Sequence, residues 1–427
     1  MFQPALETMA LSELRQLQSE RLQQTVRRLY DKVPFYQQQL DAANLTPEDI
    51  KGIEDLPRLP FTRKDDLRQH YPFGLFTMPV SDLARIHCSS GTTGKPTVVG
   101  YSPRDLEIFA EVNARSLAAA GAQPSMMLHN AYGYGLFTGG LGLHAGAERL
   151  GMSVVPVSGG MTDRQLMLLR DFEPQVICCT PSYAQTLADE CKRRSIDPAK
   201  LNLSYAVLGA EPWTETIRQQ VEAGLQVKAT NIYGLSEIIG PGVSQEAVEE
   251  RGSGSYVWED HFFPEVVHPD TGEPMPEGQD GVLCFTTLTK EAFPVLRYWT
   301  NDICSLHYDP HGGRTHVKMS AIKGRADDML IIRGVNLFHT QIEALLPQIA
   351  ELSPFYQLIV SRDANLDQVE VKVEVQQGVP LKDEYAQALS HKIKQNVGLS
   401  MKVSLMEYGQ IPRSEGGKLK RIVDQRG

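Results

Sequence analysis

A repeating order of apolar and amphipathic segments between residues 102 and 234 most restricts the fold open to this chain. Four short runs have strand-like composition: 154–158 (VVPVS), 175–180 (QVICCT), 205–210 (YAVLGA) and 227–234 (VKATNIYG). Stretches of helical length separate them, and a further helix is expected over 104–120. Such alternation predicts βαβ units, whose right-handed crossovers build a parallel sheet covered by helices. Ligands bind beyond the carboxyl ends of such strands, so the loops "GAEPW" and "YGLSE" are expected to form a site.

The pattern changes after about residue 325, which predicts a second, smaller unit. Its expected elements are a helix near 340–346, an alternating strand at 369–376, a helix at 383–397 and a strand at 402–407. Helices interleaved with alternating strands indicate a small α+β domain. A chain of 427 residues is also too long for one ordinary core. We therefore expect two domains, 1–326 and 327–427, with an amphipathic N-terminal helix packed on the first.

Charge and hydropathy exclude several classes of protein. The 42 basic and 52 acidic residues give a net charge of -10, which argues against general binding to nucleic acid or to an anionic membrane. No apolar run approaches the roughly 20 residues that span a bilayer, and the start lacks the layout of a signal peptide. Six cysteines without framework spacing predict reduced thiols. A cytoplasmic location is expected.

The segment "SSGTTGKPT" at 89–97 surrounds one lysine with glycines and hydroxyl groups. A backbone that curls at glycine lets N–H groups, hydroxyls and Lys95 converge on an anion, most simply a polyphosphate. A Walker A motif needs a glycine five residues before the Gly-Lys pair and Ser or Thr after it, whereas Ser89 and Pro96 hold those places. An ordinary P-loop NTPase is therefore excluded. A glycine-rich surface loop without a ligand is the alternative.

Five segments in fixed order resemble the adenylate-forming superfamily: "SSGTTGKPT", "GAEPW", "YGLSE", "RYWTND" with "KGRADDML", and "IPRSEGGKLKR". Further segments, among them "AYGYGLFTGGLGLHAGAERLG" and "IIRGVNLFHTQIE", resemble the phenylacetate-coenzyme A ligase branch. The resemblance implies a large α/β AMP-binding domain with parallel sheets and a small mobile α+β lid. It also implies an enzyme that uses ATP and Mg²⁺ to convert an aryl acid, with phenylacetate as the best single candidate, to acyl-AMP. Coenzyme A then takes the acyl group, with AMP and pyrophosphate as the other products.

The same resemblance assigns roles to residues of the nucleotide site. Those expected to bind ATP are Ser90, Gly91, Thr92, Thr93, Gly94 and Lys95 at the β and γ phosphates, Gly209, Ala210, Glu211, Tyr233 and Gly234 at adenine, and Asp302 and Arg325 at the ribose. A carboxylate accepts from both ribose hydroxyls, which suits Asp302. Glu237 is expected to hold Mg²⁺, an ion that prefers one or two carboxylates plus phosphate oxygens and water.

Two further roles concern the second domain. Lys418, the sixth residue from Pro412, is expected to bridge the attacking carboxylate and the α-phosphate, with Lys420 as the alternative. Asp327 in "GRADD" is expected to be the hinge about which the lid rotates between the two half-reactions. A loop carboxylate that caps "DDML" is the alternative for Asp327.

The acid pocket is expected in "NAYGYGLFTGG", where aromatic residues stand beside glycines. Tyr132 and Phe137 suit the faces of a flat ring, and Ile238, Gly240 and Pro241 after the magnesium glutamate are expected to form the opposite wall. A packing role for one of the aromatic residues is the alternative. These residues do not distinguish phenylacetate from hydroxylated, indolic or benzoic analogues.

The chain departs from the branch at two places. Trp299 stands where members usually carry a second arginine in Arg-Tyr-Arg-Thr, and a Cys-x-Cys-Gly segment is absent downstream. Cys304, His307, His311 and His316 have spacings possible for zinc ligands, although solvent-facing histidines are the favoured interpretation.

Other functions stay open beside the ligase. They are an adenylase that loads a separate carrier protein or other acceptor, and a non-catalytic ligand-binding relative. A serine hydrolase is disfavoured because no Gly-x-Ser-x-Gly elbow surrounds Ser90 or Ser236. The family resemblance favours a homodimer.

Overall fold

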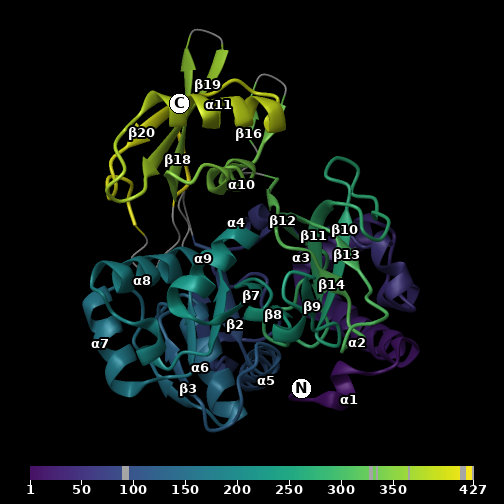
Figure 1. Cartoon of the computed structure of the whole chain (residues 1–427). Helices are drawn as coiled ribbons and strands as arrows, with labels where there is room; N and C mark the ends of the chain where they lie inside the picture. The colour runs from purple at the N-terminus through teal and green to yellow at the C-terminus, as the bar shows by residue number, and fades with distance from the viewer. Residues whose placement is uncertain (89–95, 327–329, 333–334, 364–365, 414–419, 426–427) are drawn as a thin grey trace.

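The computed structural model describes residues 1–88, 96–326, 330–332, 335–363, 366–413 and 420–425. A sheet in the order β13-β14-β9-β8-β7-β6-β5-β3-β4 forms the centre of the larger unit (Figure 1). Its parallel strands are β3 (Met127–Asn130), β4 (Ser153–Val155), β5 (Val176–Cys179), β6 (Tyr205–Gly209) and β7 (Lys228–Leu235). The strands predicted from the alternating pattern are thus confirmed, each within a few residues.

Helices cover both faces of these parallel strands. They are α5 (Pro103–Ala119), α6 (Gly139–Leu150), α7 (Thr162–Phe172), α8 (Pro181–Arg193) and α9 (Glu215–Leu225). Residues of α5 and α6 share a buried cluster with Val176 and Cys178, whereas α7, α8 and α9 share another with Ile177 and Cys179. Successive residues of a strand point to opposite faces, so one apolar run such as β5 serves both clusters.

Side-chain caps fix where the helices begin at the functional edge of the sheet. The Ser102 hydroxyl accepts a hydrogen bond from the Asp105 amide and the Asp105 carboxylate accepts one from the Ser102 amide, which makes a capping box at the start of α5. Thr180 caps α8 and Thr214 caps α9 in the same way from the N-cap position. Each cap directly follows a strand or its loop, so the helix starts are set by local sequence.

Antiparallel strands complete the larger unit. β8 (Gly240–Glu246), β9 (Ser255–Val257), β13 (Leu306–His307) and β14 (Lys318–Met319) extend the central sheet. A second sheet has the order β10 (Phe262–Val267), β11 (Gly281–Thr287), β12 (Tyr298–Cys304) and β15 (Gly324–Arg325). A hairpin of β1 (Arg85–Cys88) and β2 (Val98–Tyr101) brackets the glycine-rich segment 89–95, which lies outside the described residues.

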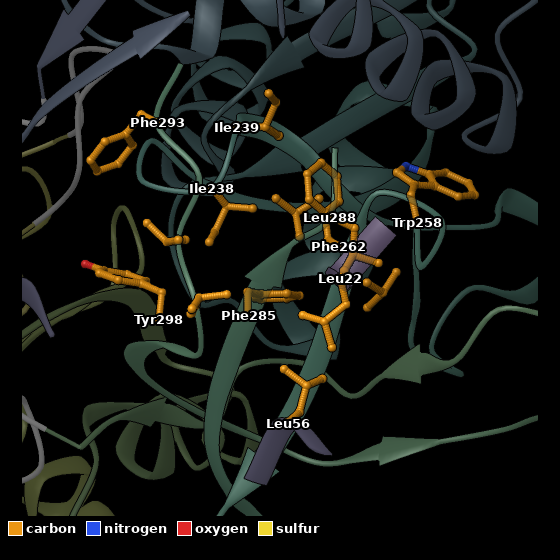
Figure 2. Packing of buried hydrophobic residues seen from close by; sticks show 14 of the residues in the cluster. Leu22, Leu56, Ile238, Ile239, Trp258, Phe262, Phe285, Leu288, Phe293 and Tyr298 are labelled. Carbon is orange, nitrogen blue, oxygen red and sulfur yellow. The ribbon is translucent and has the colours of Figure 1, made fainter. Parts of the chain in front are cut away.

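Three N-terminal helices share a core cluster with this second sheet: α2 (Leu11–Lys32), α3 (Pro34–Ala42) and α4 (Lys64–Gln69). The short helix α1 (Pro4–Glu7) instead contacts the segment 314–316. The amphipathic face of α2 buries Leu22 and Val26 in a cluster with Phe285 and Trp258. Figure 2 shows side chains of this cluster, with Ile238 and Tyr298 of the functional edge among them. The expected packing of the first helix on the main body is confirmed.

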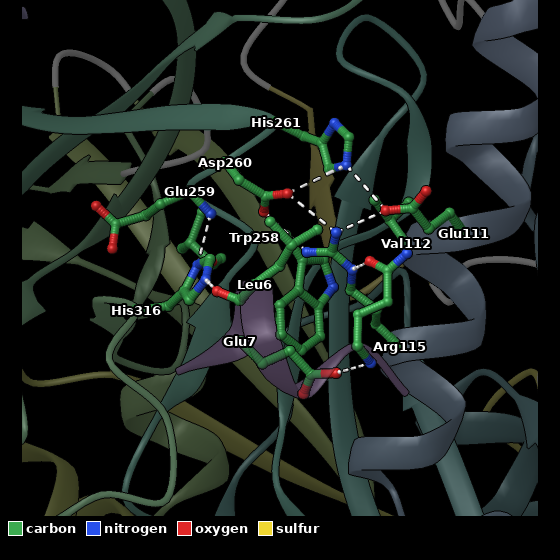
Figure 3. Close-up of polar contacts among 12 residues, drawn as sticks. Leu6, Glu7, Glu111, Val112, Arg115, Trp258, Glu259, Asp260, His261 and His316 are labelled. Carbon is green, nitrogen blue, oxygen red and sulfur yellow. Dashed lines mark hydrogen bonds and ion pairs between the residues drawn. The ribbon is translucent and has the colours of Figure 1, made fainter. Parts of the chain in front are cut away.

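A buried polar network ties α1, α5 and the start of β10 together. Arg115, which has no exposed surface, donates to both oxygens of Asp260 at 2.8 and 3.0 Å and to Glu111 at 2.6 Å. His261 lies 3.3 Å from Glu111, and Glu7 of α1 pairs with Arg314 at 2.7 Å. Figure 3 shows how these side chains converge beside Trp258. Buried charges are stable only when paired in this way.

The smaller unit lies at one end of the molecule (Figure 1). Its sheet has the order β20 (Lys402–Met406), β19 (Leu366–Val375), β18 (Leu352–Asp363) and β21 (Ile422–Asp424). Short strands β16 (Leu330–Ile332) and β17 (Val335–Leu337) precede it, together with α10 (His339–Glu343), and α11 (Asp383–Val397) follows β19. These elements share one apolar cluster of their own. The mixed α+β composition is confirmed, and the boundary at 326/327 stays a prediction.

No helix within the described ranges is long and apolar enough to cross a membrane.

Candidate active site

The loop after β6 has a tightly constrained backbone. A Cβ on Gly209 would lie 2.1 Å from the Ile232 carbonyl oxygen, so only glycine allows β6 to approach β7 this closely. Ala210 follows with a φ of 71° in the left-handed region. The Glu211 carboxylate then accepts from the amide and the hydroxyl of Ser182, at 3.2 and 3.0 Å. The predicted adenine loop is thereby fixed against the start of α8.

Three predicted nucleotide residues from distant parts of the sequence meet beside this loop. The Tyr233 hydroxyl donates to Asp302 Oδ2 at 2.6 Å, and Arg325 Nη1 lies 3.5 Å from Asp302 Oδ1. Asp302 and Arg325 are cross-strand partners in β12 and β15, and the Tyr233 ring stacks on Phe285. Burial and the Asp302 carboxylate raise the pKa of Tyr233 well above its ordinary value. Tyr233 is therefore a neutral donor that orients Asp302.

The turn "YGLSE" brings Glu237 to the same edge. A Cβ on Gly234 would lie 1.9 Å from the Gly240 carbonyl oxygen, so the turn requires glycine there. Ser236 Oγ lies 3.1 Å from Thr138 Oγ1, which joins the turn to α6. Glu237 is 7% exposed; the Tyr298 hydroxyl bonds its carboxylate, and no lysine or arginine of the described residues forms a close ion pair with it. A buried carboxylate without a close ion pair is a fitting ligand for a metal ion.

Lys290 is a residue of this edge that the sequence did not reveal. It is 3% exposed, and its Nζ lies 3.4 Å from the Glu237 carbonyl oxygen. The rings of Tyr101 and Phe293 lie 5.0 and 5.1 Å from it, within cation–π distance. Burial lowers the pKa of Lys290 to about 8. In the sequence Lys290 precedes a glutamate, a pattern typical of a solvated surface, so no local signal marks it.

The predicted acid-pocket residues gather around the first turns of α6. A Cβ on Gly139 would lie 2.9 Å from the Phe137 ring and 3.7 Å from Tyr132 Cβ. Phe137 is 36% exposed, whereas Tyr132 is only 4% exposed. The glycines of α6 thus leave the space in which both aromatic residues approach the helix.

The opposite side of this region consists of the start of β8. A Cβ on Gly240 would lie 2.9 Å from Thr138 Cβ, and a Cβ on Gly142 of α6 would lie 3.0 Å from Pro241 Cγ. Ile238 was expected in the same wall, but it has no exposed surface and packs in the core cluster (Figure 2). Its side chain therefore supports the wall from behind.

Several predicted residues lie outside the described part of the chain. They are the phosphate-loop residues Ser90, Gly91, Thr92, Thr93, Gly94 and Lys95, the hinge residue Asp327 and the catalytic lysine Lys418. Their roles stay predictions. The alternative lysine, Lys420, is exposed, and its carbonyl oxygen accepts from Gln357 of β18.

The four possible zinc ligands do not form a site. His316 is buried: its Nδ1 accepts from the Glu259 amide at 2.9 Å and its Nε2 donates to the Leu6 carbonyl at 3.0 Å. Within the described residues only Glu111, Asp260 and His261 approach metal-ligand spacing, and Arg115 already neutralises that group. The solvent-facing interpretation is right for His311, which is exposed, and wrong for His316.

Trp299 lies in β12 of the second sheet. The Arg63 guanidinium lies 4.2 Å from its ring centroid, and the Phe61 ring meets it edge-on at 5.0 Å. Trp299 Nε1 donates to Asn301 Oδ1 at 2.8 Å, next to Asp302. The departure from arginine is thus accommodated by stacking while the Asp302 geometry is kept.

Comparison with known proteins places this arrangement among nucleotide-activating enzymes. Residues 7–289 match the model of the AMP-binding enzyme family, and residues 334–426 match that of the AMP-binding enzyme C-terminal domain. The chain is 62% identical to a phenylacetate-coenzyme A ligase of Thermus thermophilus over 100% of both chains. It is 48% identical to a phenylacetate-coenzyme A ligase of Escherichia coli over 99% of this chain and 97% of that one.

Solved structures of a 2-hydroxyisobutyryl-CoA ligase share the fold at 27–28% identity, over 99% of this chain and 92% of theirs. The TM-score is 0.93 for its postadenylation state with a bound acyl-AMP and 0.74 for its thioesterification state with acyl-AMP and CoA.

Proposed function

The chain belongs to the phenylacetate-coenzyme A ligase family of AMP-binding enzymes, and from this premise we propose that phenylacetate is the acid it activates. It is an AMP-forming acid–thiol ligase: ATP converts the acid to acyl-AMP, and coenzyme A then receives the acyl group. Identities of 48–62% to named phenylacetate-coenzyme A ligases over the whole chain support the choice of acid.

The observation that carries the proposed mechanism is the meeting of Tyr233, Asp302 and Arg325 beside the loop 209–211. In adenylation, a carboxylate oxygen attacks the α-phosphorus of ATP; an O–P bond forms, and the bond to the β-phosphate bridging oxygen breaks as pyrophosphate leaves. In-line displacement of this kind requires a fixed nucleotide. Asp302 would accept from the ribose hydroxyls, and the backbone of 209–211 would meet the adenine edge.

The second half-reaction uses the mixed anhydride made in the first. The deprotonated sulfur of coenzyme A attacks the acyl carbon, a C–S bond forms, the C–O bond to AMP breaks, and the thiol proton passes to solvent. AMP is a far better leaving group than the oxygen of a free carboxylate. This difference is why the acid is adenylated first.

Glu237 is the proposed ligand of Mg²⁺, supported by its buried carboxylate without a close ion pair in the described residues. A magnesium ion bound there would neutralise phosphate charge. The sequence loop Ser90 to Lys95, which lies outside the described residues, is proposed to hold the β and γ phosphates.

The domain arrangement supports a role for the smaller unit in the first half-reaction. The higher TM-score to the postadenylation state of the 2-hydroxyisobutyryl-CoA ligase favours an adenylating arrangement here. We propose that the unit then rotates about Asp327 and withdraws Lys418. A homodimer and a cytoplasmic location are part of the same proposal and are supported by the family resemblance and the composition.

Pyrophosphate release from ATP and Mg²⁺ across a panel of aryl acids, with and without CoA, tests the proposal. Phenylacetate should give the highest kcat/KM, with AMP and phenylacetyl-CoA identified by mass. Higher kcat/KM for benzoate or a hydroxylated acid would contradict the choice of substrate. If pyrophosphate is released but the acyl-AMP stays bound in the presence of CoA, the acceptor is instead a carrier protein or another molecule.

A further inference from the structure

Tyr132 carries a hydroxyl group that the fold buries without an acceptor for its proton. The residue lies in the loop between β3 and α6, and in the described part of the chain its O–H meets no acceptor, while the Gly209 backbone N–H faces Oη. Other buried tyrosines are satisfied: Tyr36 bonds Thr62 at 2.9 Å, and Tyr101 donates to the Ile239 carbonyl at 2.9 Å. Buried polar groups ordinarily have a partner, and an unpaired one at a functional edge points to a missing ligand.

The ring of Tyr132 and its hydroxyl lie in different surroundings. The ring belongs to the apolar cluster that includes Leu143, Val207 and Ile232. The hydroxyl lies close to the main chain of Gly209 and near the Glu211 carboxylate. Oη therefore stands at the junction of the acid pocket and the nucleotide loop, where the carboxyl group of a bound aryl acid must approach the α-phosphate.

Burial, with the nearby Cys178, Cys179 and Glu211, raises the pKa of Tyr132 well above its ordinary value. The hydroxyl is thus protonated throughout the pH range in which such an enzyme is assayed. It is a permanent hydrogen-bond donor and takes no part as a base.

We propose that Tyr132 is a catalytic residue whose hydroxyl donates a hydrogen bond to the carboxylate of the bound aryl acid. One carboxylate oxygen attacks the α-phosphorus; the other accepts from Tyr132 Oη and becomes the carbonyl oxygen of the acyl-AMP. No proton is transferred, and the electron pair of the broken P–O bond leaves with pyrophosphate. This inference rests on the proposed function, because it requires an acid substrate in the pocket of Tyr132 and Phe137.

The test compares Tyr132→Phe with Tyr36→Phe, which removes a buried hydroxyl that already has a partner. For Tyr132→Phe we expect kcat/KM for phenylacetate to fall about ten- to a hundredfold, the range for a hydrogen bond to a charged group, with the KM for ATP within about twofold of the wild type. Its Tm should stay unchanged or rise, because the variant loses an unsatisfied polar group. Tyr36→Phe should show the reverse: a lower Tm and unchanged kinetics.

Ethylbenzene separates contact with the carboxylate from contact with the ring, because it keeps the aromatic group and lacks the oxygens. Its inhibition constant should be the same for the wild type and Tyr132→Phe. If the wild type is active and Tyr132→Phe is equally active, the inference about Tyr132 is wrong, whereas the proposed function stands. A variant with a lower Tm that loses ATP, ethylbenzene and phenylacetate binding together would assign Tyr132 a structural role. Wild-type protein inactive with every acid would overturn the proposed function, and this inference with it.

Discussion

The Asp302 carboxylate has a neighbour that holds each of its two oxygens. Its Oδ2 accepts from Tyr233 and its Oδ1 faces Arg325, so neither oxygen rotates freely. A preoriented acceptor loses less conformational entropy when ligand binds. Tyr233 therefore positions Asp302, and in the proposed nucleotide site it would also offer its ring to the base.

Tyr233→Phe should raise the KM for ATP about five- to twentyfold, the equivalent of roughly 1–2 kcal/mol, because the variant loses the orientation of Asp302 and keeps the Asp302 carboxylate itself. The KM for the aryl acid should change less than twofold, because Tyr233 lies on the nucleotide side. Steady-state pyrophosphate release with each substrate varied in turn measures both.

The matched control is Tyr30→Phe, which removes a Tyr–Asp hydrogen bond of 2.9 Å at an exposed place. It should leave both KM values unchanged. Equal effects of Tyr233→Phe on the two substrates would contradict the assignment of Asp302 to ATP.

Two charged residues of the interior, Arg115 and Lys290, were not disclosed by the sequence. Arg115 lies on the amphipathic helix α5, where an arginine usually faces solvent, yet it is fully buried against Asp260, 145 positions away. Lys290 is buried because two rings and a carbonyl oxygen receive it. Because these partners are distant in sequence, no local pattern of residues around Arg115 or Lys290 predicts their burial. Asp302 and Arg325, in contrast, were recognisable from the family resemblance.

At the scale of elements, the approach of β7 to β8 depends on a missing side chain. Gly234→Ala would place a Cβ 1.9 Å from a main-chain oxygen, which no rotamer change relieves. We expect the free energy of unfolding to fall by about 2 kcal/mol or more, a typical overpacking cost, and ATP affinity to fall with it. Urea denaturation and ATP titration measure the two effects.

Gly133→Ala is the control, since a Cβ there meets nothing within 4 Å. It should be close to the wild type in stability. A Gly234→Ala protein as stable as Gly133→Ala would mean that the turn rearranges freely.

The link between α5 and the start of β10 makes stability depend on pH. Burial alone would raise the pKa of Glu111, but His261 and Arg115 lower it to about 2. A carboxyl group with a lowered pKa contributes stability that is present above its ordinary value of 4.5 and lost as the pH falls toward 2. The contribution is on the order of 3 kcal/mol.

Glu111→Gln should therefore be less stable than the wild type at pH 7, and the difference should shrink as the pH falls below about 4.5. Urea denaturation between pH 7 and pH 3 measures it. Glu107→Gln, an exposed carboxylate on the same helix, should match the wild type at every pH. A difference that stays constant with pH would contradict the role of Glu111 ionisation.

The elements themselves were largely predictable. Strands β5 to β7 and helices α5 and α11 follow from apolar period and capping residues, and their bounds agree with the predictions within a few residues. The sequence left the antiparallel sheet β10-β11-β12-β15 unassigned, because its strands follow one another without the intervening helices that mark βαβ units. That sheet carries Asp302 and Arg325, so half of the proposed nucleotide site depended on resemblance to a family.

At the scale of the whole molecule, a side-chain hydrogen bond joins the smaller unit to α8. The Tyr408 hydroxyl donates to Asp189 Oδ2 at 3.2 Å, and burial raises the pKa of Asp189. A contact made in only one domain arrangement biases the equilibrium toward that arrangement by its own free energy.

Tyr408→Phe should slow acyl-AMP formation about two- to fivefold, the equivalent of roughly 0.5–1 kcal/mol. Transfer from preformed phenylacetyl-AMP to CoA should be unaffected or faster. Pyrophosphate exchange and single-turnover thioester formation measure the two half-reactions. Tyr385→Phe in α11 should alter neither, and equal slowing of both steps by Tyr408→Phe would contradict a conformational role.

The burial of Glu7 sets an order of events during synthesis on the ribosome. Its carboxylate pairs with Arg314, 307 positions later in the chain, and Leu6 bonds His316. At elongation rates of about 5–20 residues per second, that separation takes roughly 15–60 s to translate. Helix α1 therefore leaves the exit tunnel long before its partners exist. A segment made before its partners is thus able to dock only late, and the polar contacts at Glu7 form only once residues 314–316 have been translated.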